Sequence, residues 1–510
     1  MIAIHTTFHA TGLVRTAIAS ALVLLGLVAT ASAAPASVPE VRGTWLTTTA
    51  NEALRSPADS AASMRRLKEI GINTVYVESW KNGYTQFPSA VLERTIGLRQ
   101  RPVAMPQDPS DSQAVRQAPA RDLVQETLIE AHRNGLIYVS WFEYGFMAAY
   151  KDTLNHLRRQ KPEWLSRDRN GGEVAPNGFV WLNPLHPEAR KFLLDLVLEA
   201  VDRYDMDGVQ LDDRIVWPHV TMGYDDYTRA VYASEHGGRQ PPQDHHDPAW
   251  MRWRAEKVNA FSKEFVQEIR TRRPRLLISL SPAVHPWAWE HYLLEWPMWS
   301  AWTARDGLRD APFRDPASAA TVPRWDEFIP QAYRNSYADF ERTWREQVDA
   351  MRTLGGDRQR DLIAGIRIVG DGPDSSWEQL RDSIALTRKL GNGGHVLWFS
   401  RGVLDLYAPQ LTALYRSSGP AHSPHFGPGW RRPAIALRKA GRAAGGLQRW
   451  VAPALPAGRY RAIGHDGAHW QYLDRPRPAG RVWTIAQQYR QVELILDRRA
   501  DMAAAPHKTK

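Results

Sequence analysis

The chain has 510 residues, of which 43% are hydrophobic and 24% charged, so it is large enough for several domains and too apolar for wholesale disorder. It contains no cysteine, which excludes disulfides, cysteine-ligated metals and a cysteine nucleophile. The net charge of +10 is concentrated in residues 421–510, which hold 16 Lys and Arg against 5 Asp and Glu. The 21 tryptophans suggest a ligand with flat faces, such as a sugar or a base, although tryptophan also fills protein cores.

The first residues have the pattern of an export signal. Arg15 precedes an apolar stretch over residues 17–30, and the small residues Ala31-Ser32-Ala33 follow as a cleavage pattern. The apolar stretch is too short for a membrane span, and no later stretch reaches 18 apolar residues. We therefore expect a signal peptide over residues 1–33, a mature chain without a transmembrane segment, and a periplasmic or extracellular location.

Eight short apolar runs then alternate with amphipathic helical segments. Near-continuous apolarity predicts parallel strands that are covered on both faces. Eight such units predict an α/β fold, a (β/α)₈ TIM barrel over residues 41–418. A doubly wound sheet is the alternative, but Gly43-Thr44-Trp45 is not the glycine-rich phosphate turn expected after its first strand. The predicted strands are Val41–Thr47, Asn73–Glu78, Leu136–Phe142, Gly208–Asp212, Leu276–Ser281, Glu327–Gln331, Leu362–Arg367 and His395–Ser400.

A small β-rich domain is predicted over residues 421–502, after a linker at residues 417–420 and before a disordered tail at residues 503–510. Its basic character suggests binding to an anionic cell-wall or envelope surface, and a solvated arginine-rich surface is the alternative. No nucleic-acid motif is present, so no nucleic-acid partner is expected. We expect a chain that ends near Gly419 to fold without this domain. Its predicted strands are Leu447–Ala452, Tyr460–Ile463, Trp470–Leu473, Val482–Gln488 and Val492–Leu496.

Acidic residues end three neighbouring strands of the predicted barrel: Glu78, Glu143 and the pair Asp212-Asp213. Catalytic groups of such barrels lie at the carboxyl ends of the strands. Two carboxylates at one barrel mouth match glycoside hydrolysis, in which one acid protonates the leaving oxygen and the other attacks the anomeric carbon or activates water. This chemistry requires neither a metal nor a cofactor. An ion pair at Glu78, a supporting role for Glu143 and a loop cap at the aspartates are the structural alternatives.

Aromatic and polar side chains at the same strand ends would bind the sugar by stacking and by hydrogen bonds. Trp141 stands beside Glu143, so we expect it to stack on a sugar ring and to be dispensable for folding. The candidate binding residues taken from these ends are Trp80, Trp141, Tyr144, His285, Gln331, Tyr333, Trp398 and Arg401.

Several motifs together resemble the glycosyl-hydrolase-like family 10 of exported bacterial proteins. They are Glu40–Thr47, Gly71–Val77, Asn82-Gly83, Phe87-Pro88-Ser89, Trp141-Phe142, Asp207–Asp213, Ser281-Pro282-Ala283 and Pro330–Tyr333, within about Val41 to Leu414.

The resemblance implies a barrel glycosidase, with some members acting on the glycan strands of peptidoglycan. It places the family's aspartate pair at Asp212 and Asp213, its strand-1 arginine at Arg42, and its strand-6 glutamine and tyrosine at Gln331 and Tyr333. Asn82 occupies a position where members often have an acid or an amide. Glu143 stands where members often have asparagine, so the catalytic acid could differ in this chain.

The leading interpretation is a secreted glycoside hydrolase that acts on a bacterial polysaccharide. Asp212 is the candidate nucleophile or base, because strand alternation points it inward while Leu211 packs outward. Glu143 is the candidate acid, with a pKa raised by burial against aromatic neighbours, and Glu78 and Asp213 are held in reserve. Two alternatives remain open. One is a non-catalytic polysaccharide-binding protein, and the other a metal-dependent deacetylase or esterase that would use Asp212, Asp213 and His285.

Overall fold

The computed structural model describes residues 37–102, 121–305, 325–356 and 358–503. The expected signal peptide, and the expected tail apart from its first residue, lie outside the described residues. No helix among the described residues is both long enough and apolar enough to cross a membrane.

Eight parallel strands form a barrel whose strand order follows the chain. The last strand, β13, pairs back onto the first, β2. Parallel bridges from Phe328 to Leu362 and from Gln331 to Gly365 join β11 to β12 and close the ring. The (β/α)₈ fold is therefore confirmed, and a doubly wound sheet, which has two free edges, is ruled out. The strands are β2 (Val41–Leu46), β3 (Thr74–Glu78), β6 (Ile137–Phe142), β9 (Gly208–Asp212), β10 (Leu277–Ser281), β11 (Glu327–Phe328), β12 (Ala364–Arg367) and β13 (Gly394–Trp398).

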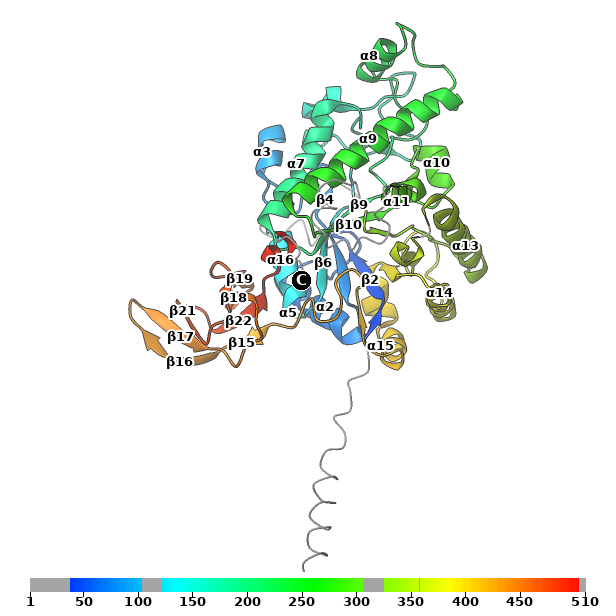
Figure 1. Cartoon of the computed structure of the whole chain (residues 1–510). Coiled ribbons are helices and arrows are strands. Elements are labelled where there is room, and N and C mark those ends of the chain that lie inside the picture. Colours follow the sequence, from blue (N-terminus) through cyan, green and yellow to red (C-terminus); the bar gives the residue numbers. More distant parts are fainter. Residues whose placement is uncertain (1–36, 103–120, 306–324, 357, 504–510) are drawn as a thin grey trace, which may run out of the picture.

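The helices between the strands form the outer layer (Figure 1). In α7 (Pro187–Arg203) the buried residues Leu193, Leu196, Val197 and Ala200 recur every three or four positions, so one stripe of the helix faces the strands. Apolar stripes of this kind cover the outward-facing side chains of the barrel strands. The other helices that follow the eight strands are α2 (Pro57–Ile70), α5 (Leu123–Arg133), α9 (Pro248–Arg272), α11 (Trp296–Arg305), α13 (Tyr337–Leu354), α14 (Trp377–Lys389) and α15 (Ala408–Ser417).

Polar side chains fill part of the barrel interior and pair with one another. The Trp45 indole donates to Gln210 Oε1 at 2.8 Å, and Gln210 Nε2 donates to Ser279 Oγ at 2.8 Å. These contacts fix the inward face of β9. Successive side chains of a strand alternate between its faces, so Asp212, two residues after Gln210, also points inward.

The connections at the carboxyl ends of the strands carry short elements that surround the barrel mouth. They are β4 (Trp80–Lys81), β5 (Tyr84–Thr85), α3 (Ala90–Ile96), β7 (Met147–Tyr150), α6 (His156–Gln160), η1 (Pro162–Trp164), β8 (Phe179–Trp181), α8 (Asp226–Glu235), α10 (Trp287–Tyr292) and η3 (Gly402–Leu406). A further short helix, η2 (Gln359–Asp361), leads into β12 from the opposite end.

The C-terminal part is β-rich and lies beside α5, away from α8 and α10 (Figure 1). One sheet has the order β15-β22-β18-β19, with β20 on β18, and a second has the order β16-β17-β21. Its elements are β15 (Ile435–Ala436), β16 (Arg438–Ala443), β17 (Leu447–Val451), β18 (Arg459–His465), β19 (Trp470–Tyr472), β20 (Arg477–Pro478), β21 (Val482–Ala486), β22 (Gln491–Leu496) and α16 (Arg499–Ala503). In addition, β14 (Ala421–His422) pairs with β1 (Val38–Pro39).

Buried ion pairs join this C-terminal part to the amino end of the barrel. Arg431 contacts Asp207 at 2.8 Å and Asp205 at 3.4 Å, and the Trp430 indole also donates to Asp207. His425 contacts Glu327 inside the barrel at 2.9 Å. The segment after Gly419 therefore packs against the amino end of the barrel through buried ion pairs, which argues against the expectation that a chain ending there folds.

Candidate active site

Asp212 is the centre of the barrel mouth and is 2% exposed. Its Oδ2 accepts hydrogen bonds from the Trp141 indole at 3.0 Å and from Arg214 Nη1 at 2.8 Å. Its Oδ1 accepts from Gln331 Nε2 at 2.5 Å, from the Asp213 amide at 2.7 Å and from Ser281 Oγ at 3.3 Å. Five donors from β6, β10 and the loops after β9 and β11 hold this carboxylate, and such an arrangement suits its anionic form.

Arg214 connects Asp212 to two further carboxylates. The nitrogen Nη1 that contacts Asp212 also lies 3.9 Å from Glu143 Oε1, and Nε lies 3.5 Å from Asp213 Oδ1. Asp212 and Glu143 share this nitrogen, so their nearest oxygens lie within about 7 Å of each other, close enough for both to reach one glycosidic bond. The structure thus brings Glu143, Asp212 and Asp213 together.

Lys81 forms a second bridge, between Glu143 and Glu78. Its Nζ lies 3.5 Å from Glu143 Oε2 and 3.4 Å from Glu78 Oε2. Glu78 is completely buried and accepts four further hydrogen bonds, from Thr47 Oγ1, Thr48 N, Thr48 Oγ1 and Gln86 Nε2. Both of its oxygens are therefore engaged, so Glu78 is a poor candidate for the proton donor and a good one for holding Lys81 beside Glu143.

The two central carboxyl groups are shifted toward their protonated forms to different extents. Burial raises the pKa of Glu143, the neighbouring charge of Glu78 adds to the rise, and Lys81 and Arg214 oppose it. Burial also raises the pKa of Asp212, with Arg214 opposing and Asp213 adding to the effect. Asp212 is stabilised as an anion by its five donors, whereas Glu143 contacts cations only at 3.5 Å or more. The hydrogen-bond geometry therefore favours Glu143 as the proton donor of the pair, although the pKa of Asp212 is raised further.

Aromatic rings form one continuous wall beside the carboxylates. The rings of Trp45, Trp141, Tyr333 and Trp398 lie in mutual contact, with centroids 5.7–6.5 Å apart. Tyr333 and Trp398 are stacked on each other and half-buried, so each side chain is partly exposed to solvent. Sugar binding by these two residues stays a prediction.

Trp141 and Trp80 do not fit their predicted roles as sugar platforms. Trp141 is 1% exposed and donates its indole hydrogen to Asp212, so it positions a carboxylate instead of offering a free ring face. Trp80 is completely buried against Phe192 and donates to the carbonyl of Gly145. Both assignments are corrected because an unexposed ring cannot stack on a substrate.

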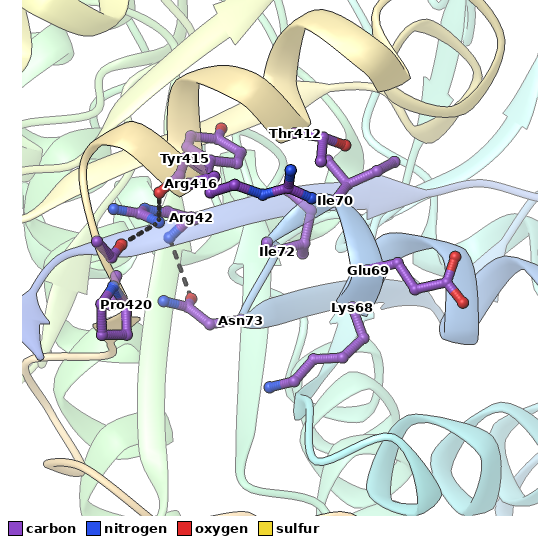
Figure 2. A pocket seen from close by; sticks show the side chains of 13 residues that line it. Arg42, Lys68, Glu69, Ile70, Ile72, Asn73, Thr412, Tyr415, Arg416 and Pro420 are labelled. Carbon is purple, nitrogen blue, oxygen red and sulfur yellow. Dashed lines mark hydrogen bonds between the residues drawn. The ribbon is translucent and has the colours of Figure 1, made fainter. Parts of the chain in front are cut away.

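Arg42 is the second residue of β2 and so lies at the amino end of the barrel, whereas Asp212 ends β9 at the carboxyl end. Figure 2 shows Arg42 in the pocket at this amino end. Its guanidinium contacts Glu40 at 2.7 Å and donates to the carbonyls of Tyr415 and Gly419. The residue is 2% exposed and lines a pocket of about 380 Å³ at this end, between the end of α2 and the end of α15. The prediction that Arg42 binds the substrate at the mouth is therefore wrong. Arg42 instead joins the first barrel strand to the end of the last helix, α15.

The other predicted binding residues divide by exposure. Tyr144 and Asn82 are buried, and the Asn82 carbonyl accepts a hydrogen bond from Asn155, so both shape the loops around the mouth. Arg401 is exposed beside Phe399. The backbone of His285 is held by Gln347 on α13, and the structure gives no contact between His285 and the aspartates.

Two charged residues that organise the site, Lys81 and Arg214, were missed as site residues by the sequence analysis. Each follows a predicted catalytic acid by two or three positions, as in Glu78–Lys81 and Asp212–Arg214. A cationic residue two or three positions after an acid at a strand end was the sequence signal that could have identified both residues. The Arg214 guanidinium lies 2.8 Å from Asp212, and its positive charge disfavours a metal cation at the same carboxylate.

We expect Trp141→Phe to lower kcat by about 10- to 100-fold, because a hydrogen bond to a charged group contributes about 1.5–3 kcal/mol. The phenyl ring keeps most of the aromatic contacts and removes only the donor to Asp212. Trp325→Phe removes a similarly buried indole hydrogen bond, to Ser262, and should leave kcat unchanged. Steady-state kinetics on a soluble glycan would measure both, and a Trp141→Phe enzyme with the parental kcat would contradict the positioning role.

Comparison with known proteins gives a consistent assignment. A model of the family described as glycosyl hydrolase-like 10 matches residues 40–351. The chain is 24% identical over 259 residues to glycosyl hydrolase YngK of Bacillus subtilis, covering 48% of this chain and 45% of YngK. It is 29% identical over 153 residues to glycosyl hydrolase DigH of Escherichia coli, covering 29% of this chain and 32% of DigH.

The matched regions thus span less than half of either relative. Among solved structures, the PgaB (BpsB) glycoside hydrolase domain from Bordetella bronchiseptica aligns at a TM-score of 0.45 with 16% identity, covering 70% of this chain and 92% of that domain.

Proposed function

The chain belongs to the glycosyl hydrolase-like 10 family, and from this premise we propose that it is an exported glycoside hydrolase that cleaves O-glycosidic bonds of a bacterial polysaccharide. The observation that carries the proposal is the pair of carboxylates, Asp212 and Glu143, held by one nitrogen of Arg214 at the barrel mouth. Two carboxyl groups at this separation are the minimum machinery of the reaction.

In this mechanism Glu143 gives its proton to the oxygen of the leaving sugar as the glycosidic bond breaks. Asp212 supplies the negative charge at the anomeric carbon, either by attacking it or by taking a proton from the attacking water. Lys81 balances the charge that develops on Glu143, and Arg214 adjoins both carboxylates throughout. Tyr333 and Trp398 offer the stacked aromatic surface for a sugar ring.

As the substrate we propose the glycan strand of peptidoglycan, which is the class that the family resemblance implies. The test is to incubate the protein with denuded peptidoglycan strands and with other bacterial glycans, and then to size the products. Shortened strands would support the hydrolase. Strands of unchanged length that remain bound would favour the non-catalytic alternative, and activity lost with a chelator would favour the metal-dependent one.

The pH dependence of this reaction should report the ionisation of Glu143. An acid must be protonated to act, so activity should be present below the pKa of Glu143 and be lost as the pH rises through it. Because burial and Glu78 raise this pKa, the alkaline limb should lie above the ordinary range of a glutamate. Lys81→Met removes a cation that lowers the pKa of Glu143, so the limb should move to higher pH.

Profiles of kcat/KM against pH would check this prediction. Lys257→Met is the matched control, because Lys257 pairs with Glu235 on the surface and should not shift the limb. A limb that stays in place in Lys81→Met would contradict the role of Glu143 as the acid.

We further propose that the basic C-terminal part binds an anionic envelope polymer. The outer face of the sheet β16-β17-β21 supports this, because Arg438 and Arg449 are exposed on it, opposite the buried Trp450 and Trp483. Retention on cell-wall material should weaken as salt rises and in an Arg438→Ser, Arg449→Ser variant. Retention that is independent of salt would count against it.

A further inference from the structure

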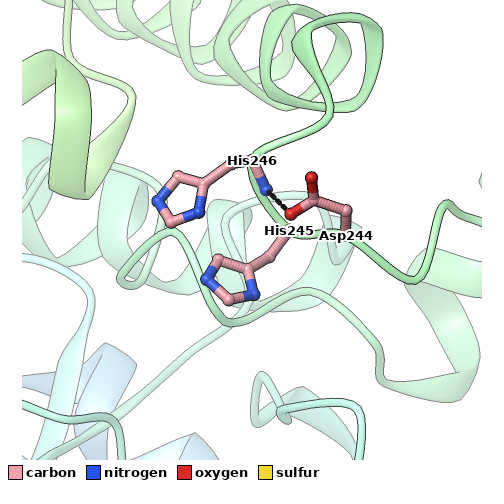
Figure 3. Close-up of side chains that lie close together, drawn as sticks. All are labelled: Asp244, His245 and His246. Atoms are coloured by element: carbon pink, nitrogen blue, oxygen red, sulfur yellow. Dashed lines mark hydrogen bonds between the residues drawn. The ribbon is translucent and has the colours of Figure 1, made fainter.

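A group of histidines lies in the long connection after β9, outside the residues assigned to hydrolysis. Asp244, His245 and His246 each offer one ligand atom, and these three atoms lie within 4.8 Å of one another (Figure 3). The imidazoles of His245 and His246 are side by side, with centroids 4.3 Å apart. Asp244 Oδ1 accepts the backbone amide of His246 at 2.9 Å, which fixes the position of the carboxylate relative to the backbone of His246.

The connection is fixed at this point by Arg254 of α9, which is completely buried. Its guanidinium donates to the carbonyls of Val220, Met222 and His245. One side chain thus joins the segment that carries His245 to the segment around Val220. The group of histidines therefore has a rigid support, although its own side chains reach the surface.

Two more imidazoles lie at the segment around Val220, which Arg254 joins to the carbonyl of His245. His219 precedes Val220, and its ring lies 5.9 Å from that of His291, whose carbonyl accepts the Val220 amide.

We propose that Asp244, His245 and His246 bind a divalent transition metal, with zinc as the expected ion and His219 as a further nearby imidazole. Two imidazoles and one carboxylate are a donor set that suits zinc, whereas calcium and magnesium require oxygen ligands. Zinc ligands lie about 2.0–2.2 Å from the ion, so the three atoms need to approach by only small movements of exposed side chains. The proposal is independent of the hydrolase activity.

The experiment uses the full chain without a histidine tag, treated with a chelator and then titrated with zinc chloride in a calorimeter. Cobalt gives a second readout through its visible absorption. We expect one tight zinc ion per chain and a loss of affinity of at least about tenfold in His245→Ala and in His246→Ala. His422→Ala, which alters a histidine bonded to Ser37 at the other end of the barrel, should bind zinc as the parent does.

Several results would overturn the site. They are the absence of zinc binding, an unchanged affinity in a His245→Ala, His246→Ala double variant, or equal binding of magnesium. The two histidines are partly or fully exposed, so the variants should fold, and a circular dichroism spectrum would verify this. A folded double variant that has lost the tight zinc ion but still shortens glycan strands would support the metal site and leave the proposed hydrolase intact.

Discussion

Asp212→Asn should reduce kcat by about a thousandfold or more while the protein stays folded. The amide matches the carboxylate in size, but it removes the negative charge that the anomeric carbon requires in the transition state. The amide nitrogen also presents hydrogens toward groups that donate to Asp212, including the Trp141 indole and Arg214. The loss should therefore appear in kcat and not in substrate binding alone.

Asp225→Asn is the matched control for this variant. Asp225 is similarly buried, at 7% exposure, but it caps α8 and forms its hydrogen bonds with Asn183 and Thr228 instead of with Trp141 or Arg214. Its variant should keep kcat. Cleavage at the parental rate by Asp212→Asn would refute the mechanism, and inactivation by Asp213→Asn alone would transfer the central role to Asp213, whose side chain is 25% exposed.

The barrel and the place of Asp212 follow from local rules that the sequence expresses directly. Parallel strands that are buried on both faces appear in the sequence as continuous apolar runs. All eight predicted runs overlap a barrel strand. The alternation of side chains along Gly208–Asp212 then decides which residues face inward. Leu211 is completely buried while Asp212 meets Trp141 and Ser281 from the neighbouring strands, as the alternation predicts.

The parts that were missed depend on contacts between distant segments. The sequence shows a tryptophan beside Glu143, but only the packed barrel shows that its indole hydrogen points to Asp212 and that its ring is covered. Arg42 was assigned by resemblance, although its place at the second residue of β2 puts it at the amino end of a strand. Catalytic groups of these barrels lie at the carboxyl ends, and that rule would have argued against the assignment.

Arg431→Ala should lower the free energy of unfolding by about 3–5 kcal/mol, the cost of removing one partner from a buried ion pair. Arg431 joins the C-terminal part to Asp205 and Asp207 at the start of β9, and all three residues are buried. Arg432→Ala is the control, because this neighbouring arginine is exposed and its loss should change stability by no more than about 0.5 kcal/mol. Denaturant titration followed by circular dichroism would measure both.

From the same ion pairs we predict how the difference in free energy of unfolding between the parent and Arg431→Ala depends on pH. Arg431, together with the hydrogen bond from His132, lowers the pKa of Asp207 to about 2 against the opposing effect of burial. A lowered pKa in the folded state contributes stability above the ordinary pKa of an aspartate, and this contribution is lost as the pH falls toward 2. The difference in free energy of unfolding between the parent and Arg431→Ala should therefore become smaller in acid. A chain that ends at Gly419 loses Arg431 and the pair between His425 and Glu327 together, so it should fail to fold. A folded and active chain of that length would show instead that the C-terminal part is a dispensable tether.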